Sequence, residues 1–328
     1  MSPSKVAQEI SHSNVWVVGE VLVDLIPSID GDTKIDGNSY KPVVGGGPAN
    51  TARAMSKWGV STSFIGGFSS DRFGHIAWSE MSRDGVDLDL ALDSDLPTAK
   101  ALLAFDETGK AGYRFEVEST ATFDFRQEWL PTEIPSEIPT LIHIGSLVTV
   151  VQPGAETLFN WLLNLRSAKK PPVVLFDPNV RTAFLDDSAQ YREHFERWIA
   201  LTDLVKASDE DLSFLYPEEN HEAIVQKVLK DGPSHFVITY GENGIKGFTR
   251  QEQMKVDSSQ VRVIDTVGAG DTVGAIIAAA VAGSGLDSLH GDEYRSVLSL
   301  ASRASAITCS RQGANSPTQN EYDDFWRQ

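Results

Sequence analysis

The feature that most constrains the fold of this chain is a regular alternation of short apolar runs with longer amphipathic segments. Several of the runs are apolar on both faces, as expected of strands buried between two layers of helices. Strands and helices alternating at this spacing predict βαβ units and a parallel sheet. We expect strands at residues 15–18, 63–65, 141–144, 173–176, 203–206 and 236–239, and helices at residues 155–166, 191–200 and 222–229.

Two stretches do not fit this alternation. Residues 21–44 are strand-like but interrupted by proline and glycine, and residues 99–120 hold two short apolar runs on either side of a turn at residues 106–109. The second pattern is typical of a β-hairpin. Since neither stretch suits a crossover helix, we expect both to form a small β appendage over one edge of the sheet, within a single domain. No element is predicted after Gly313.

The composition argues against several classes of protein. The chain has 328 residues with 46 acidic and 28 basic side chains, a net charge of -18, which argues against binding to nucleic acid or to an anionic membrane. Its one cysteine, Cys309, excludes an intrachain disulfide and a thiolate metal cluster. The most apolar stretch, residues 275–282, is far shorter than the roughly 20 residues of a membrane span. With no signal-peptide pattern in the polar N-terminus, we expect a cytoplasmic protein that binds small molecules.

The strongest motif is Asp-Thr-Val-Gly-Ala-Gly-Asp at residues 265–271. It follows an apolar run at residues 261–264, which predicts a strand, and it opens a predicted helix. The small residues Gly268, Ala269 and Gly270 would leave the amide groups at the helix start unobstructed. Such amides, together with the helix dipole, favour the binding of an anion.

The last residue of this motif, Asp271, would place a carboxylate beside the anion. One chemistry explains that arrangement: the carboxylate accepts a proton from a hydroxyl that attacks a phosphoryl group held by the amides. The proton leaves late in a loose transition state, so the base has only to be ionised and well placed. The alternative is a capped helix whose glycines serve only close packing.

A second glycine-rich motif, Gly-Gly-Gly-Pro-Ala-Asn, occupies residues 45–50. Its glycines allow a ligand to approach the backbone, and its proline suits a first helical turn that would carry Asn50. No Gly-Lys-Ser/Thr follows, so it is not a P-loop, and its glycine spacing is not that of a dinucleotide fingerprint. A purely structural turn is an equal alternative. Asp24, at a strand end, lies where open α/β sheets bind ligands, although such an aspartate is more often a turn or cap residue.

Two further motifs follow predicted strands. Thr-Tyr-Gly-Glu-Asn-Gly at residues 239–244 has two glycines three positions apart, which suits either the approach of a nucleotide or a plain hairpin turn. Asp-Pro-Asn-Val-Arg at residues 177–181 places a fixed turn and a cation at another strand end. Arg181 is the best candidate for a cation that faces phosphate, against the alternative of a solvated arginine.

In this order, the motifs resemble those of the ribokinase (PfkB) family of sugar kinases. Gly-Glu-Val-Leu-Val-Asp-Leu-Ile at residues 19–26 and His-Ile-Gly-Ser-Leu at residues 143–147 are most similar to the bacterial fructokinases of that family. The resemblance spans residues 15–313. It implies a ribokinase-like, Rossmann-type α/β/α sandwich with a small β lid, and the transfer of the ATP γ-phosphoryl group to a primary sugar hydroxyl.

The resemblance also implies roles for individual residues. Asp271 would be the general base, assisted by Arg181 and by an anion hole at Gly268, Ala269 and Gly270. The sugar would be held by Asp24, Gly46, Gly47, Asn50 and Arg114. The nucleotide would be held by Lys206, Ser208, Thr239, Gly241, Gly244 and Gly313. The metal ligands would be Asp211 for Mg²⁺ (through water), and Asp265 with the Val267 carbonyl for a monovalent cation such as K⁺.

The chain departs from the family pattern on the magnesium side. The usual Asn-x-x-Glu appears as Ser-Asp-Glu-Asp at residues 208–211, which keeps one carboxylate but shortens its side chain. The leading hypothesis is an ATP-dependent fructokinase that produces fructose 6-phosphate. A 2-keto-3-deoxygluconate kinase is the runner-up, since Arg114 or Arg181 could hold the carboxylate of that sugar acid.

Two hypotheses come from other classes of protein. A sugar-sensing binding protein without catalysis is disfavoured by the intact motif around Asp271. An oxidoreductase with a Rossmann fold is disfavoured because the fingerprint glycines are missing after the first strand. Relatives often form dimers through their lids, so a homodimer is also expected.

Overall fold

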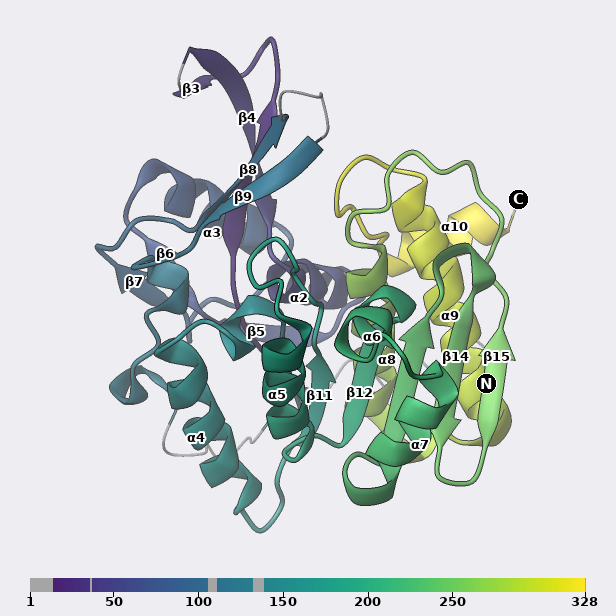
Figure 1. The fold of residues 1–328 in the computed structure, drawn as a ribbon. Coiled ribbons are helices and arrows are strands. Elements are labelled where there is room, and N and C mark those ends of the chain that lie inside the picture. Colours follow the sequence, from purple (N-terminus) through teal and green to yellow (C-terminus); the bar gives the residue numbers. More distant parts are fainter. Residues whose placement is uncertain (1–13, 36, 106–110, 132–138, 328) are drawn as a thin grey trace.

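The centre of the molecule is a sheet of eight strands in the order β15-β14-β13-β12-β11-β10-β1-β5 (Figure 1). The structure is a computed structural model that describes residues 14–35, 37–105, 111–131 and 139–327. The parallel part of the sheet comprises β1 (Asn14–Val18), β5 (Ser61–Ile65), β10 (Leu141–Gly145), β11 (Val173–Asp177), β12 (Leu204–Ser208) and β13 (His235–Thr239). The antiparallel strands β14 (Ile245–Thr249) and β15 (Gln253–Val256) complete one edge.

The six strands predicted from the alternation of apolar runs and helices are all present, each bounded within two residues of its expected position. Their sequences are apolar on both faces because both faces are covered. In β1, Val15 and Val17 join the apolar cluster on one side of the sheet, whereas Trp16 and Val18 join the cluster on the other side. This alternation follows from the two-residue period of a strand.

Two layers of helices cover the sheet (Figure 1). The predicted α/β/α sandwich is therefore confirmed. One layer consists of helices whose buried side chains belong to a single apolar cluster: α2 (Gly47–Lys57), α3 (Arg72–Arg83), α8 (Ala269–Ser284) and α9 (Gly291–Cys309). The other layer consists of helices whose buried side chains belong to the second cluster: α4 (Gly154–Arg166), α5 (Ser188–Ile199), α6 (Asp209–Leu215) and α7 (His221–Asp231).

A second sheet stands apart from these layers and is called the lid sheet below (Figure 1). Its strand order is β3-β4-β2-β8-β9. The strands are β2 (Leu22–Pro27), β3 (Thr33–Ile35), β4 (Asn38–Gly45), β8 (Lys100–Phe105) and β9 (Ala111–Glu116). It thus joins the two stretches that broke the βαβ alternation, around a small buried cluster of Val23, Leu25, Tyr40 and Leu102. The turn expected at residues 106–109 lies outside the described residues.

The segment at residues 261–264 was predicted as a strand, and this prediction is wrong. Val263 and Ile264 are 60% and 62% exposed, and the amide of Ile264 donates to the Cys309 carbonyl at the end of α9. Apolar residues at strand spacing form a strand only where a partner edge is open to their amides. The missing pairing leaves this segment as irregular chain that leads into α8.

The C-terminal segment, for which no element was predicted, forms α10 (Gln319–Trp326). It begins with a capping box, in which the hydroxyl of Thr318 accepts from the Glu321 amide and the carboxylate of Glu321 accepts from the Thr318 amide. The Thr-x-x-Glu pattern is a recognisable helix start. In the part of the chain that the structure describes, no helix has the length and apolar character needed to cross a bilayer.

Candidate active site

Two cavities adjoin at the carboxyl ends of the parallel strands. The first cavity has a volume of about 720 Å³, and the second cavity has a volume of about 760 Å³. The residues that line both are Thr239, Gly241, Thr266 and Gly270. The start of α8 therefore lies where one cavity passes into the other, as a shared wall.

The first turn of α8 exposes backbone donors to the first cavity. Gly268 caps the helix at a φ of 79°, which is the left-handed region that glycine adopts readily. The amide of Ala269 donates to the Thr266 carbonyl at 3.2 Å, so Ala269, predicted as part of the anion hole, does not offer its amide freely. Gly268 and Gly270, which both line the first cavity, are left as the wall of an anion site at this helix end.

Asp271 is buried at the same helix end, with 8% of its surface exposed. Its Oδ2 accepts a hydrogen bond of 2.9 Å from Nδ2 of Asn50. Burial raises the pKa of Asp271 to about 6, against the opposing effects of Lys206 and of the Asn50 hydrogen bond. The carboxylate is therefore ionised at neutral pH, yet basic enough to accept a proton.

A buried ion pair lies beside this aspartate. Nζ of Lys206 is 2.7 Å from Oδ2 of Asp177, and both side chains are almost fully buried. Burial works to lower the pKa of Lys206, but the carboxylates of Asp177 and Asp271 outweigh it and raise the pKa. A side chain at Gly270 would place its Cβ 3.0 Å from Nζ of Lys206. Glycine thus allows a permanent cation to approach the anion site.

The turn after β11 and the start of α2 meet equally closely. A Cβ at Gly47 would lie 2.2 Å from Nδ2 of Asn179 and 3.5 Å from Oδ1 of Asp271. Since real Cβ atoms do not tolerate the first of these distances, any larger residue at position 47 would displace the Asn179 amide. This contact joins three motifs that lie far apart in the sequence: the triple glycine, the Asp-Pro-Asn turn and the Asp271 segment.

The far end of the first cavity carries more carboxyl groups. Asp24 and Glu20 line it together with Gly46, Asn50 and Arg181. Burial raises the pKa of Asp24 to about 6, with Arg181 opposing the shift. Burial also raises the pKa of Glu20 to about 7. The sequence analysis gave Glu20 no role, although Glu20 lies two residues after the end of β1, the kind of strand-end position predicted for Asp24. The prediction for Asp24 was wrong in this respect, because Asp24 lies within β2 of the lid sheet, where it pairs with Val43 of β4.

The acidic segment after β12 forms the beginning of α6. Ser208 and Asp211 make a capping box, and the other carboxylate oxygen of Asp211, Oδ1, accepts from the Val180 amide at 2.8 Å. Burial raises the pKa of Asp211, and the neighbouring charge of Asp177 raises it further. Lys206, Ser208 and Asp211 all line the first cavity.

The second cavity is lined by a hairpin turn and by small side chains of α9. The turn between β13 and β14 carries Gly241 and Gly244, so it is both a hairpin turn and a cavity wall. On the opposite wall lie Ser302, Ser305 and Cys309. Small residues along one face of α9 keep the volume open.

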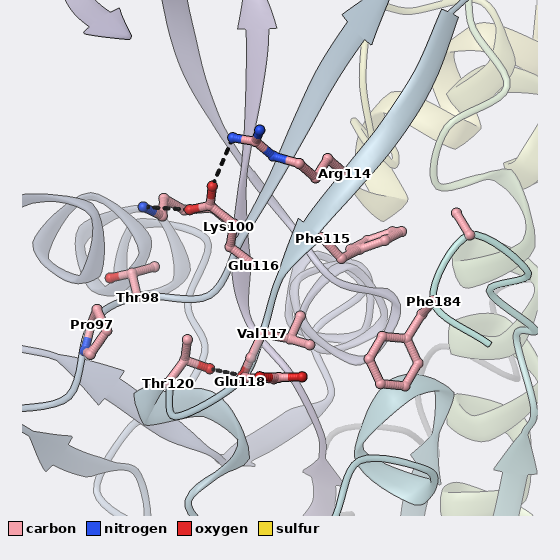
Figure 2. Close-up of a pocket in the computed structure, with 11 residues that line it drawn as sticks. Pro97, Thr98, Lys100, Arg114, Phe115, Glu116, Val117, Glu118, Thr120 and Phe184 are labelled. Atoms are coloured by element: carbon pink, nitrogen blue, oxygen red, sulfur yellow. Dashed lines mark hydrogen bonds and ion pairs between the residues drawn. The ribbon is translucent and has the colours of Figure 1, made fainter. Parts of the chain in front are cut away.

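Three of the predicted site residues lie elsewhere. Arg114 lies on β9 with its side chain 64% exposed and Nη2 3.0 Å from Oε1 of Glu116. It lines a third cavity of about 640 Å³, beside the lid sheet (Figure 2). Asp265 and Gly313 are not among the described residues that line the first two cavities. Instead, the Asp265 carboxylate accepts from the amides of Val267 at 3.1 Å and Gly313 at 2.9 Å, and so ties two loops together.

Comparison with known proteins agrees with this geometry. The profile of the family described as "pfkB family carbohydrate kinase" matches residues 12–321. The chain belongs to this family. It is therefore a carbohydrate kinase, a phosphotransferase whose acceptor is an alcohol group, with the ribokinase-like fold expected from its motifs.

Similar proteins include several fructokinases. A fructokinase of Rhizobium leguminosarum bv. trifolii is 33% identical over 263 residues, which cover 80% of this chain and 78% of that protein. The crystal structure of the fructokinase of Vibrio cholerae with fructose, ADP and a calcium ion has a TM-score of 0.82 and 26% identity, covering 96% of this chain and 99% of that one. A double mutant of that enzyme, with fructose, ADP and a potassium ion, has a TM-score of 0.83 and 25% identity, covering 96% of this chain and 98% of that one.

Proposed function

We propose that this kinase transfers the γ-phosphoryl group of ATP to the primary hydroxyl of fructose and produces fructose 6-phosphate. The observation that carries the proposal is the position of Asp271, which lines the first cavity next to Gly270, a residue that lines both cavities. The first cavity, with its carboxyl groups and Asn50, suits a sugar. The second, with its small residues and hairpin glycines, suits the nucleoside part of ATP.

The proposed step needs one proton acceptor. Asp271 accepts the hydroxyl proton as the sugar oxygen attacks the γ-phosphorus, and the bond from that phosphorus to the β–γ bridging oxygen breaks to release ADP. Asp271 then returns its proton to water. Since the proton leaves late in a loose transition state, position matters more than base strength. The amides at the start of α8 would stabilise the charge on the transferred group.

Cationic side chains would balance the phosphate charge. Lys206, 2.7 Å from Asp177, would face the terminal phosphates, and Arg181 would face the transferred group from the sugar side. The buried Asp211 carboxylate lies close enough to that of Asp177 for the two negative charges to interact. Carboxylate oxygens and negative charge suit Mg²⁺, which would be held here through water. When bound with ATP, Mg²⁺ would neutralise phosphate charge. Asp265 and the Val267 carbonyl remain the proposed ligands of a monovalent cation.

The relatives support fructose as the acceptor. The similar curated proteins are fructokinases, and the Vibrio cholerae enzyme was crystallised with fructose and ADP. Arg114, one of two candidate partners for the carboxylate of 2-keto-3-deoxygluconate, is paired with Glu116 and lies in the third cavity. Arg181 is the other candidate, and it faces Glu20 and Asp24.

A coupled assay of ADP release with ATP and Mg²⁺ tests this proposal. Fructose, 2-keto-3-deoxygluconate, ribose and adenosine are compared by kcat/KM, and we expect the highest value with fructose. Fructose binding without ADP release would instead indicate a sugar-binding protein that lacks catalysis. A higher value with the sugar acid would identify the runner-up activity.

A further inference from the structure

Glu20 is a buried acid of the first cavity that the proposed phosphoryl transfer does not use. It lies two residues after the end of β1 and is 1% exposed, yet it lines the cavity that Asp24 and Asn50 also line. The Val148 amide donates to its Oε2 at a long 3.4 Å, and the Ser146 side chain and the amide of Glu20 itself also favour the ionised form and lower the pKa. A carboxyl group in such a position is costly to bury, which suggests a role in binding.

The charges around Glu20 are unbalanced. Burial raises the pKa of Glu20 to about 7, while Ser146 and then Arg181 oppose the shift. The same guanidinium opposes the shift of Asp24. Arg181 therefore serves two carboxyl groups at this end of the cavity. Arg181 itself is half-buried, whereas the buried cation of the cavity, Lys206, is paired with Asp177.

This balance favours one kind of acceptor. Above pH 7, where both Glu20 and Asp24 are ionised, their carboxylates only accept hydrogen bonds. Each sugar hydroxyl can donate one, so a neutral polyhydroxy sugar complements this pair. A sugar acid would bring a third negative charge toward these two groups. In a buried cavity, such a like-charge contact is a strong means of rejecting the wrong ligand.

We propose that Glu20 determines acceptor specificity: together with Asp24 it selects a neutral polyhydroxy sugar and rejects a sugar that carries a carboxylate. This inference rests on the proposed function, because it assumes that the first cavity holds the acceptor. The inference concerns ligand binding, however, and is tested by dissociation constants, whereas the proposed function is tested by ADP release.

The test uses the full-length protein and two charge-removing variants, Glu20→Gln and Glu118→Gln. Glu118 is exposed and lines the third cavity (Figure 2), which makes it a matched control. Dissociation constants for fructose and for 2-keto-3-deoxygluconate are measured by calorimetry, and their ratio gives the selectivity. We expect wild type and Glu118→Gln to bind fructose more tightly than 2-keto-3-deoxygluconate. In Glu20→Gln, we expect the ratio of the two dissociation constants to shift toward the sugar acid by at least about tenfold.

Two results would overturn the inference: an unchanged ratio in Glu20→Gln, or tighter binding of the sugar acid by wild type. Should Glu20→Gln not fold, Glu20→Asp keeps the charge on a shorter side chain. We expect that variant to bind fructose more weakly but to retain its preference, and loss of the preference would count against the proposal. A protein that binds fructose selectively without releasing ADP would refute the kinase step on fructose and leave the role of Glu20 standing.

Discussion

Nδ2 of Asn50 lies 2.9 Å from Oδ2 of Asp271, although 221 positions separate the two residues in the chain. The hydrogen bond joins the first turn of α2 to the first turn of α8. Oδ1 of Asn50 is buried and has no partner among the described residues, so it is available to a hydroxyl of the acceptor. This one side chain is therefore placed to contact both the proposed base and the proposed acceptor.

Replacing Asp271 with Asn is expected to lower kcat by about 10²–10⁴-fold, because the amide cannot accept the hydroxyl proton. Fructose binding should be nearly unchanged, since the substitution preserves shape. Steady-state kinetics and calorimetry measure the two effects separately. Asp287→Asn, at an exposed position in the short 3-10 helix that follows α8, is the control and should behave as wild type. Wild-type turnover in Asp271→Asn would show that another group is the base.

Replacing Asn50 with Ala is expected to weaken sugar binding by about 1–3 kcal/mol, because buried polar partners are left unpaired. It should also change the pH dependence. Wild-type kcat should fall as the pH drops through about 6, where Asp271 becomes protonated. Since the Asn50 hydrogen bond holds that pKa down, the loss should begin at higher pH in the variant. A pH profile identical to that of wild type, or to that of the exposed control Asn160→Ala, would contradict this role.

Replacing Lys206 with Met should abolish most activity and also destabilise the fold. The substitution leaves the Asp177 carboxylate buried without its partner at 2.7 Å, a loss that typically costs about 3–5 kcal/mol. Urea unfolding at neutral pH measures it. Adding Asp177→Asn should restore part of the stability and none of the activity. If Lys206→Met were as stable as wild type, Lys206 and Asp177 would not form a buried ion pair that stabilises the fold.

Replacing Glu20 with Gln is expected to stabilise the protein at high pH. The folded-state pKa of about 7 exceeds the usual 4.5, so the folded state holds more protons between these values, and the stability this provides is lost as the pH rises through 7. The neutral amide avoids that loss. We expect the variant to gain roughly 1–3 kcal/mol in unfolding free energy at pH 8 and little near pH 5. Unfolding curves at pH 5 and pH 8 test this prediction. It would be refuted if the unfolding free energies of the variant and wild type differed by the same amount at both pH values.

Cys309 offers a chemical test of the second cavity. It lines that cavity, and burial followed by the charge of Asp265 raises the pKa of its thiol. We therefore expect slow alkylation by N-ethylmaleimide at pH 7, faster reaction at higher pH, and protection by ATP. As the chain has one cysteine, mass spectrometry reports this site alone, and Cys309→Ser should stay active under the reagent. Alkylation unaffected by ATP would place the nucleotide elsewhere.

The parts of the fold that could be predicted are those decided by local pattern. Two-sided apolar runs marked the parallel strands because both sheet faces are buried, and the interruptions within residues 21–44 marked the lid sheet. The run at residues 261–264 is also strand-like, although it includes Arg262, but the amide of Ile264 bonds to the end of α9 instead of to a strand. Local pattern reports propensity, whereas a strand also requires an open edge beside it.

The site divides in the same way. By itself the sequence determined the alternation of strands and helices, the small residues before Asp271, and the motifs at the strand ends, because these depend on near neighbours and on steric size. Only the tertiary structure decided that Arg114 lies outside the first cavity, that Lys206 pairs with Asp177, and that Glu20 is buried among the groups proposed to hold the sugar. The protonation state of a side chain, its pKa and the cavity that it lines depend on burial and on distances of a few ångströms. These are fixed by contacts between residues far apart in the chain.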